Sequence, residues 1–281
     1  MKNWILTGDT HGRVTARLDN IRRNMSDYKP EETAVIILGD AGINYYLNKS
    51  DKKNKHQICD RGYTVYCVRG NHEERPENVE GMKLVYDEEV HGWVYQEAAF
   101  PLIKYFVDGG EYNINGHSCL VIGGAYSVDK YWRLASAQGS FSGWFEDEQL
   151  TDEEKESIAR KVAGKTYDFV FTHTCPYSWE PTDLFIGCVD QTTVDQSTEI
   201  WLEEISRNIK WRTWCFGHFH DDRIERPCVE QFYYQYVDME TVWNRWYGER
   251  TFQLEKDMLN KSPFMYYFMV EERKGICHHY G

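Results

Sequence analysis

Acidic, amide and imidazole side chains recur in five short blocks of this sequence. Carboxylates, imidazoles and amide oxygens are ligands that first-row divalent cations such as Mn²⁺, Fe and Zn²⁺ accept, and no thiolate is needed. The blocks are Gly-Asp-Thr-His-Gly at 8–12, Gly-Asp at 39–40, Arg-Gly-Asn-His-Glu at 69–73, Thr-His at 172–173 and Gly-His-Phe-His at 217–220. The candidate ligands within them are Asp9, His11, Asp40, Asn71, His173, His218 and His220.

This set of ligands is large enough for two cations. In such a site one carboxylate bridges the metals, which lie about 3.5–4 Å apart around a shared hydroxide. Asp9 and Asp40 offset only part of the charge of two divalent ions, so the centre stays positive and attracts a phosphate ester. A metal-bound water with a pKa of about 7 would supply the nucleophile at neutral pH.

Each candidate ligand, taken alone, also has a structural explanation. Asp9 and Asp40 fit helix N-caps that follow strands, and His173 fits a buried, hydrogen-bonded histidine. Together with the other blocks, the metal site is the favoured interpretation.

Apolar runs stand directly before the five blocks and predict buried strands. These runs are residues 4–7, 34–38, 63–68, 168–172 and 212–216. Helical spacing or polar composition predicts helices at residues 14–24, 47–60, 151–162 and 197–209. Because loops at the carboxyl ends of strands form the sites of α/β sheets, we expect the blocks to meet at one edge.

The middle of the chain has a different sequence pattern. Short runs between residues 82 and 123, separated by Gly and Asn-Gly, predict antiparallel hairpins that start a second sheet. Residues 123–133 are expected to form a loop, and residues 231–237 a Tyr-rich strand. We expect one domain over residues 1–281, with the tail from about residue 239 packed on it as an extension.

Composition limits the class of protein. The 281 residues carry a formal net charge of −13, which disfavours extended binding to nucleic-acid backbones. No apolar run reaches the roughly 18 residues of a membrane span, and the first residues do not fit a signal peptide. The eight cysteines include no C-x-x-C pair and are expected to be reduced. These features predict a cytoplasmic protein without a membrane partner.

The five blocks, in this order, resemble the calcineurin-like metallophosphoesterase superfamily, in its bacterial or phage-type members. The resemblance implies an α/β fold in which a two-sheet β-sandwich is flanked by helices. It also implies that His72 is the general acid for the leaving alcohol or a group that stabilises the transition state. By the same resemblance, Asp40 bridges the two metals. One metal is assigned to Asp9, His11, Asp40 and His220, and the other to Asp40, Asn71, His173 and His218.

The sequence also differs from one branch of that superfamily. The first and third blocks are similar to the protein Ser/Thr phosphatases, whose second block continues Gly-Asp-x-x-Asp-Arg-Gly. Here Asp40 is followed by Ala-Gly-Ile-Asn, so the phosphate-binding Arg is missing, and His220 is an additional difference. We therefore expect another phosphatase activity, with Lys130 or Arg133 binding phosphate and Arg69 as the alternative.

The predicted function is hydrolysis of phosphate esters by a metal-bridging hydroxide, with a phosphatase favoured over a phosphodiesterase. Mn²⁺ is the favoured cofactor, with Fe, Zn²⁺ and Ni²⁺ as alternatives. The expected partner is a small phosphate ester, a nucleotide or another phosphorylated substrate. Two alternatives stay open: a phosphodiesterase for nucleotides or nucleic-acid ends, and a non-catalytic binding scaffold.

Overall fold

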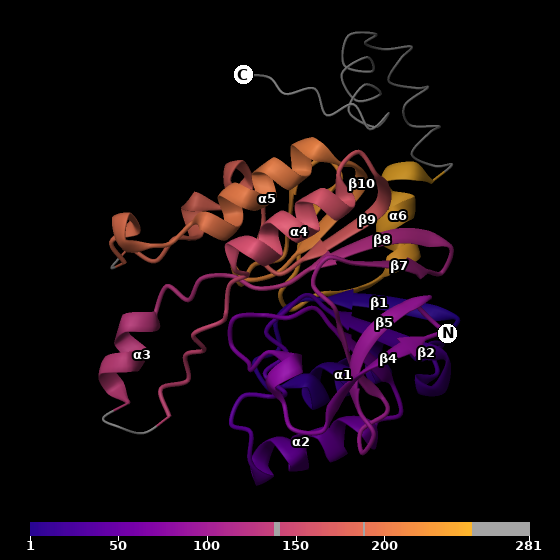
Figure 1. The fold of residues 1–281 in the computed structure, drawn as a ribbon. Coiled ribbons are helices and arrows are strands. Elements are labelled where there is room, and N and C mark those ends of the chain that lie inside the picture. Colours follow the sequence, from indigo (N-terminus) through magenta and orange to yellow (C-terminus); the bar gives the residue numbers. More distant parts are fainter. Residues whose placement is uncertain (138–140, 188, 249–281) are drawn as a thin grey trace, which may run out of the picture.

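Two β-sheets stacked face to face form the centre of the protein, and helices cover both outer faces (Figure 1). The computed structural model describes residues 1–137, 141–187 and 189–248. Within these residues the sheets contain seven and six strands. The predicted α/β fold, a two-sheet sandwich flanked by helices, is confirmed.

The seven-stranded sheet has the order β13-β1-β2-β3-β6-β5-β4. Its four central strands, β1, β2, β3 and β6, run parallel, and the other three are antiparallel to their neighbours. Helices α1 (Val14–Asn24) and α2 (Lys49–Cys59) pack on its outer face. The strands are β1 (Asn3–Thr7), β2 (Thr33–Ile37), β3 (Thr64–Cys67), β4 (Met82–Asp87), β5 (Gly92–Glu97), β6 (Ile103–Phe106) and β13 (Tyr236–Asp238).

The six-stranded sheet has the order β11-β12-β10-β9-β8-β7. Strands β8, β9, β10 and β12 run parallel, and both edge strands are antiparallel. Helices α4 (Asp152–Val162) and α5 (Ser197–Asn208) cover its outer face. The strands are β7 (Gly110–Ile114), β8 (His117–Ile122), β9 (Thr166–Thr172), β10 (Lys210–Phe216), β11 (Arg223–Arg226) and β12 (Val229–Gln231).

Apolar side chains from both sheets fill the space between them. Leu6 and Ile36 from the first sheet share one buried cluster with Val121 and Phe171 from the second. Burying each such side chain stabilises the fold by about 1.5–3 kcal/mol. The two sheets are therefore held in a fixed relative position, which also fixes the loops at their ends.

Three local expectations were wrong. Strands β4, β5 and β6 belong to the first sheet, because β6 pairs in parallel with β3, and only β7 and β8 begin the second. The segment expected to be a loop contains the start of helix α3 (Lys130–Ser136), where Asp129 pairs with Arg133 one turn later. The expected strand at 231–237 is interrupted, because the Asp222 carboxylate accepts the backbone N–H groups of residues 233–235.

The end of the described chain packs on the sandwich. Helix α6 (Met239–Tyr247) places Met239 and Val242 in the cluster between the sheets. Residues 249–281, which include most of the tail, lie outside the described residues, so the single-domain prediction stays a prediction. Within the described residues, every helix is too short or too polar to cross a membrane.

Candidate metal centre

The loops after β1, β2 and β10 hold their ligand candidates in an unusual backbone conformation. His11, Asp40, His218 and His220 have φ angles of 45°, 45°, 68° and 56°. Residues other than glycine seldom adopt positive φ, and such residues concentrate at functional sites. The three loops therefore turn sharply and direct these side chains toward one another.

Glycines beside the ligands allow side chains to approach the backbone closely. A Cβ atom on Gly39 would lie 1.9 Å from Nδ1 of His173, and one on Gly217 would lie 2.4 Å from Oδ1 of Asp9. Each contact joins a loop of one sheet to a side chain from the other sheet. The glycines of the second and fifth blocks are therefore needed to bring the two halves of the site together.

Asp9, His11 and His220 form the first ligand group. One ligand atom from each of these residues lies within 4.8 Å of the others. Nε2 of His220 is 2.9 Å from Nε2 of His11 and 3.3 Å from Oδ2 of Asp9. Oδ2 of Asp9 is buried and has no hydrogen-bond partner among the described residues. A carboxylate oxygen left unpaired beside two imidazoles fits a cation ligand.

The second group brings together Asp40, Asn71 and His173. Nε2 of His173 is 2.8 Å from Oδ1 of Asn71 and 3.4 Å from Oδ1 of Asp40. Nδ1 of His173 lies 3.0 Å from the carbonyl oxygen of Leu38, to which it donates. This bond leaves the Nε2 lone pair free for a metal. The ring of His218 lies 5.0 Å from the ring of His173.

Asp40 lies between the two groups. It forms one possible ligand set with Asp9 and His173, and another with His11 and His72. Burial favours a higher pKa for Asp40, but the nearby histidines and the backbone N–H of His72 hold this pKa well below its usual range. An ionised carboxylate between two ligand groups fits the predicted bridge.

Two of the histidines show opposite pKa shifts. Burial lowers the pKa of His218 to about 3, and the positive neighbourhood of His173 adds to the effect. The nearby Asp9 carboxylate raises the pKa of His220. His218 is therefore neutral at physiological pH, which is the form that binds a metal.

A hydrogen-bond chain orients Asn71, and no sequence pattern predicts it. The side-chain Nδ2 of Asn71 donates to Oγ of Ser127 at 2.8 Å. Ser127 in turn donates through its backbone N–H (3.0 Å) and its hydroxyl to the carboxylate of Glu148. This chain fixes the amide of Asn71 so that its oxygen faces His173. Ser127 lies beside the Lys130 and Arg133 that were singled out, but its hydroxyl carried no metal-ligand pattern.

His72 lies beside the bridge candidate and is paired with Arg133. Nε2 of His72 is 3.7 Å from Oδ2 of Asp40, and the Arg133 guanidinium contacts the imidazole nitrogens. Burial lowers the pKa of His72, against the attraction of Asp40, and Arg133 lowers it further. Because arginine only donates hydrogen bonds, this contact requires an accepting imidazole nitrogen and favours the neutral form.

The three basic candidates for phosphate binding occupy different positions. Arg133 bonds Asp129 at 2.7 Å and the Gly143 carbonyl as well as His72. The amine of Lys130 lies 4.2 Å from the centre of the Trp144 ring. Arg69 lies under the site, only 2% exposed, and its guanidinium bonds Asp108 (2.7 Å) and the carbonyl of Glu148 (2.6 Å). A substrate therefore does not reach Arg69 in this arrangement.

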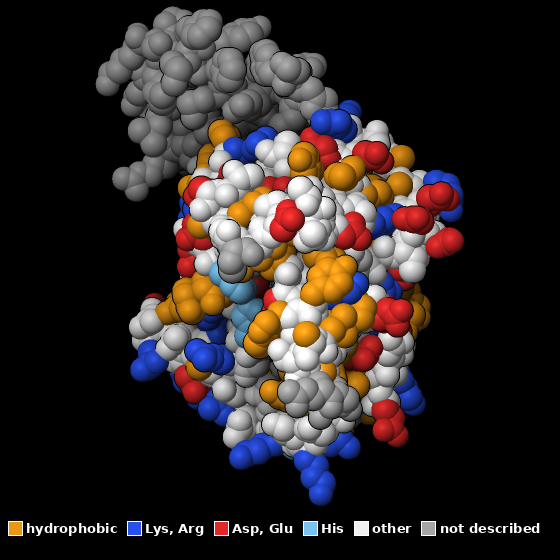
Figure 2. Space-filling model, turned by 90° about the vertical axis from the view of Figure 1, so that its left-hand side faces the viewer, with side chains coloured by type: hydrophobic (Ala, Val, Ile, Leu, Met, Phe, Trp, Pro, Cys, Tyr) orange, Lys and Arg blue, Asp and Glu red, His pale blue; other side chains and the backbone are white. Residues whose placement is uncertain are grey.

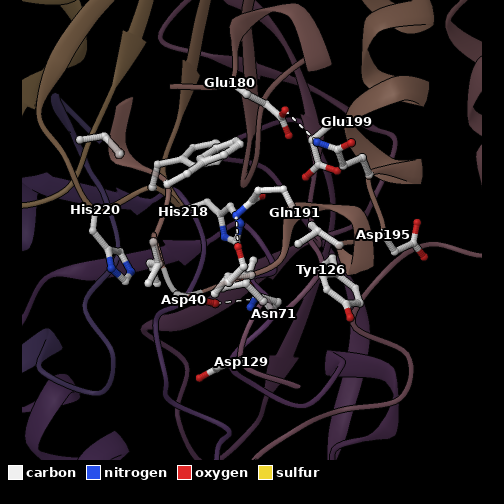
Figure 3. Close-up of a pocket in the computed structure, with 18 of the residues that line it drawn as sticks. Asp40, Asn71, Tyr126, Asp129, Glu180, Gln191, Asp195, Glu199, His218 and His220 are labelled. Atoms are coloured by element: carbon white, nitrogen blue, oxygen red, sulfur yellow. Dashed lines mark hydrogen bonds between the residues drawn. The ribbon is translucent and has the colours of Figure 1, made fainter. Parts of the chain in front are cut away.

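A cleft of about 340 Å³ opens beside the ligands. Figure 2 shows histidine side chains at the floor of a hollow with hydrophobic side chains on its rim. Figure 3 shows Asp40, Asn71, His218 and His220 on one side of this cleft and Glu180 and Glu199 on another. The centre is therefore open to a small molecule.

Comparison with known proteins establishes the family. The family model for calcineurin-like phosphoesterases matches residues 4–222, and the chain belongs to this family. It is therefore a metal-dependent phosphoesterase by family, with candidate ligands for divalent cations in place. No curated protein sequence matches the chain. One matching solved structure has 12% identity and a TM-score of 0.44, covering 85% of this chain and 96% of that chain.

Proposed function

We propose that this protein hydrolyses small phosphate esters at a centre of two divalent cations. The observation that carries the proposal is the convergence of seven donor side chains from five strand ends, with the buried Oδ2 of Asp9 accepting no hydrogen bond from the described residues. The same convergence speaks against the non-catalytic scaffold, which does not need an ordered set of donors.

The ligands divide between the cations as the geometry of the two groups suggests. Asp9, His11 and His220 would hold one cation, while Asn71, His173 and His218 would hold the other, with Asp40 shared. When bound, the cations supply Lewis acidity toward the phosphate and a hydroxide nucleophile at neutral pH. We propose Mn²⁺ as the cation, because carboxylate, amide and imidazole donors without a thiolate suit it.

His72 serves the leaving group in this proposal. It lies next to Asp40 on the face of the site that opens into the cleft. A protonated His72 would act as the general acid, whereas a neutral one would stabilise the departing oxygen by a hydrogen bond. The contact with Arg133 supports the second form, so Arg133 is proposed to position His72 and to strengthen the field felt by the phosphate.

A phosphatase is favoured over a phosphodiesterase, and a small substrate over a polynucleotide. The cleft is short, and no lysine or arginine is among its described lining residues. A nucleic-acid strand needs such cations along its backbone. A mononucleotide remains compatible with the cleft. We place the activity in the cytoplasm, which agrees with Cys59, Cys67, Cys119, Cys175 and Cys215 being outside any disulfide; Cys188 and Cys277 lie outside the described residues.

A substrate panel combined with metal titration tests this function. Metal-free protein is supplied with Mn²⁺, Zn²⁺, Fe²⁺ or Ni²⁺ and assayed on p-nitrophenyl phosphate and on bis-p-nitrophenyl phosphate. We expect turnover that requires a divalent ion and is faster on the monoester. Absence of turnover with every ion would overturn the proposal, and faster turnover of the diester would replace the phosphatase with the phosphodiesterase.

A further inference from the structure

Part of the cleft wall beside the metal ligands is apolar. Leu184, Phe185 and Val194 line it from the segment between β9 and α5, and Phe219 lines it from the loop after β10. The rings of Phe185 and Phe219 are nearly parallel, at an angle of 19° with centres 6.4 Å apart. This wall suits the apolar body of an organic group joined to the phosphate.

Glu199 at the start of α5 is among the residues that line this cleft, and one of its carboxylate oxygens is unpaired. The residue is 4% exposed, and its Oε1 accepts a hydrogen bond from the Thr174 hydroxyl at 2.8 Å. Its Oε2 is buried and has no hydrogen-bond partner within the described part of the chain. A buried carboxylate oxygen without a donor is costly, and a ligand that supplies a donor removes that cost.

Glu180 lies near Glu199 and adds a second acceptor. Oε2 of Glu180 accepts from the side-chain amide of Gln196 at 3.1 Å, and all three residues line the cleft (Figure 3). Burial raises the pKa of both glutamates to about 7. The described lining contains no lysine or arginine that could neutralise them. The partner that these two carboxyl groups lack is therefore a hydrogen-bond donor or a cation from outside the chain.

We propose that Glu199, assisted by Glu180, recognises an N–H donor on the organic group of the substrate, whose apolar body lies along Phe185 and Phe219. This inference rests on the proposed phosphoesterase function, since it assigns the end of the substrate that is remote from the phosphate. The substrate class is thus a phosphate ester of a small, largely apolar molecule that ends in an amino or amino-like group.

Charge excludes the opposite class of ester. A second phosphate or a carboxylate on the organic group would face Glu180, Asp195 and Glu199 without a described basic side chain to receive it. Like charges at such short range, in a site of low polarity, repel strongly. Polyphosphates and acidic phosphometabolites are therefore poor substrates in this account. The N–H donor itself has two sources: an aliphatic ammonium group or the exocyclic amino group of a nucleobase.

Matched aryl phosphates test the proposal. The phosphate ester of tyramine, 4-ethylphenyl phosphate and the phosphate ester of 3-(4-hydroxyphenyl)propionate differ only at the group remote from the phosphate. We expect kcat/KM to be about tenfold higher for the tyramine ester than for 4-ethylphenyl phosphate, with the propionate compound lowest. In E199Q the ratio of kcat/KM for the tyramine ester to that for 4-ethylphenyl phosphate should fall toward one. E204Q, which changes an exposed glutamate on the same helix, should keep the wild-type ratio.

The two arms of the test separate the sources of the donor. A preference for GMP over IMP, which lacks the exocyclic amino group, would assign the donor to a nucleobase. A preference for the tyramine ester without discrimination between the nucleotides would assign it to an alkylamine. Either result supports the inference. Equal kcat/KM for the tyramine ester and 4-ethylphenyl phosphate, together with equal values for GMP and IMP, would overturn the inference. An unchanged preference in E199Q would also overturn it.

A binding measurement keeps this inference separate from the proposed catalysis. Calorimetry with phenethylamine and with 3-phenylpropionate needs no turnover, so it decides the matter even if every ester fails to react. We expect the wild-type protein to bind phenethylamine more tightly than the acid, and E180Q and E199Q to weaken that binding. Equal or absent binding of the amine would exclude the alkylamine source, and it would overturn the inference if guanosine also bound no more tightly than inosine. Failure of all esters alone would contradict only the proposed function.

Discussion

The ligand cluster and the cleft beside it share His218 and His220 but are built in different ways. The ligands stand directly after buried strands; four of them have positive φ, and His173 bonds to the backbone of the opposite sheet. The far wall of the cleft comes from an irregular segment with two short turns, η4 (Thr182–Leu184) and η5 (Gln191–Thr193). The rigid sandwich therefore fixes the reactive centre, while the irregular segment between β9 and α5 determines which group of the substrate fits next to it.

The carboxyl groups of the ligand cluster and of the cleft also differ in their pKa shifts. Histidines around Asp40 hold its pKa below the usual range, whereas burial, with the nearby Glu180 and Asp195 adding to the effect, raises the pKa of Glu199 to about 7. Burial acts in the same direction on both groups, so the neighbours decide the outcome. Asp40 is suited to bind a resident cation, whereas Glu199 is suited to accept a hydrogen bond from the substrate.

The largest expected effect is that of Asp40→Asn, which removes the shared charge. We expect kcat on p-nitrophenyl phosphate to fall by roughly 1,000-fold or more, because both cations lose a ligand. Asp195→Asn, at a carboxylate of the cleft outside the ligand groups, should change kcat less than about threefold. Similar losses in the two variants, measured at saturating Mn²⁺, would remove the distinction between the two regions.

A smaller effect is expected for His218 and His220, the histidines of the fifth block, which we assign to different cations. His218→Ala and His220→Ala should each weaken the binding of one cation by roughly 100-fold. The double variant should lose both, because the assignments are separate. Calorimetric titration with Mn²⁺ measures the stoichiometry, and His117→Ala, which removes contacts with Glu240, Phe169 and Trp243 but none with the ligand groups, is the matched control. A double variant that binds like either single variant would place both histidines on the same cation.

His72→Ala tests the leaving-group role. We expect a kcat loss of roughly 100-fold on an alkyl phosphate and a clearly smaller loss on p-nitrophenyl phosphate, whose leaving group needs no assistance. Arg133→Gln, which removes the guanidinium beside His72, should reproduce the same pattern more weakly. Equal losses of His72→Ala on both esters would assign His72 to metal binding instead.

The smallest expected effect concerns stability. The folded protein holds the proton of Glu199 more tightly than the unfolded chain, since burial raises its pKa from 4.5 to about 7. Its contribution to the free energy of unfolding is present below pH 4.5 and is lost as pH rises through about 7. Between pH 5 and pH 8 the wild type should therefore lose up to roughly 3 kcal/mol relative to Glu199→Gln. Urea unfolding at both pH values measures this, and parallel pH dependence in the two proteins would show that Glu199 is ionised when folded.

The ligand side chains could be predicted because each follows a continuous apolar run. Strands such as β2 and β10 are recognisable locally, and parallel pairing brings their carboxyl ends to one edge. The choice of sheet for β4, β5 and β6 could not be predicted, since the composition of Met82–Asp87 indicates a strand without identifying the neighbouring strand. That choice depends on the distant pairing of β6 with β3.

The cleft could not be predicted for a related reason. Glu180 and Glu199 stand in segments without a metal-ligand spacing, and their environment comes from residues far along the chain such as Phe219. Ser127 and Glu148, which orient Asn71, show the same limit, because a supporting hydrogen bond has no pattern of its own in the sequence. Periodicity identifies the elements, whereas the partners of a polar side chain follow only from the folded chain.

The most direct test of the account is the number of cations that the protein needs for turnover. Metal-free protein is titrated with Mn²⁺ while bound metal is counted by elemental analysis and phosphate release is followed. We predict that activity reaches its maximum only when two equivalents are bound per chain, and that Asp40→Asn does not reach this state. Full activity with one equivalent, or without metal, would contradict the dinuclear centre.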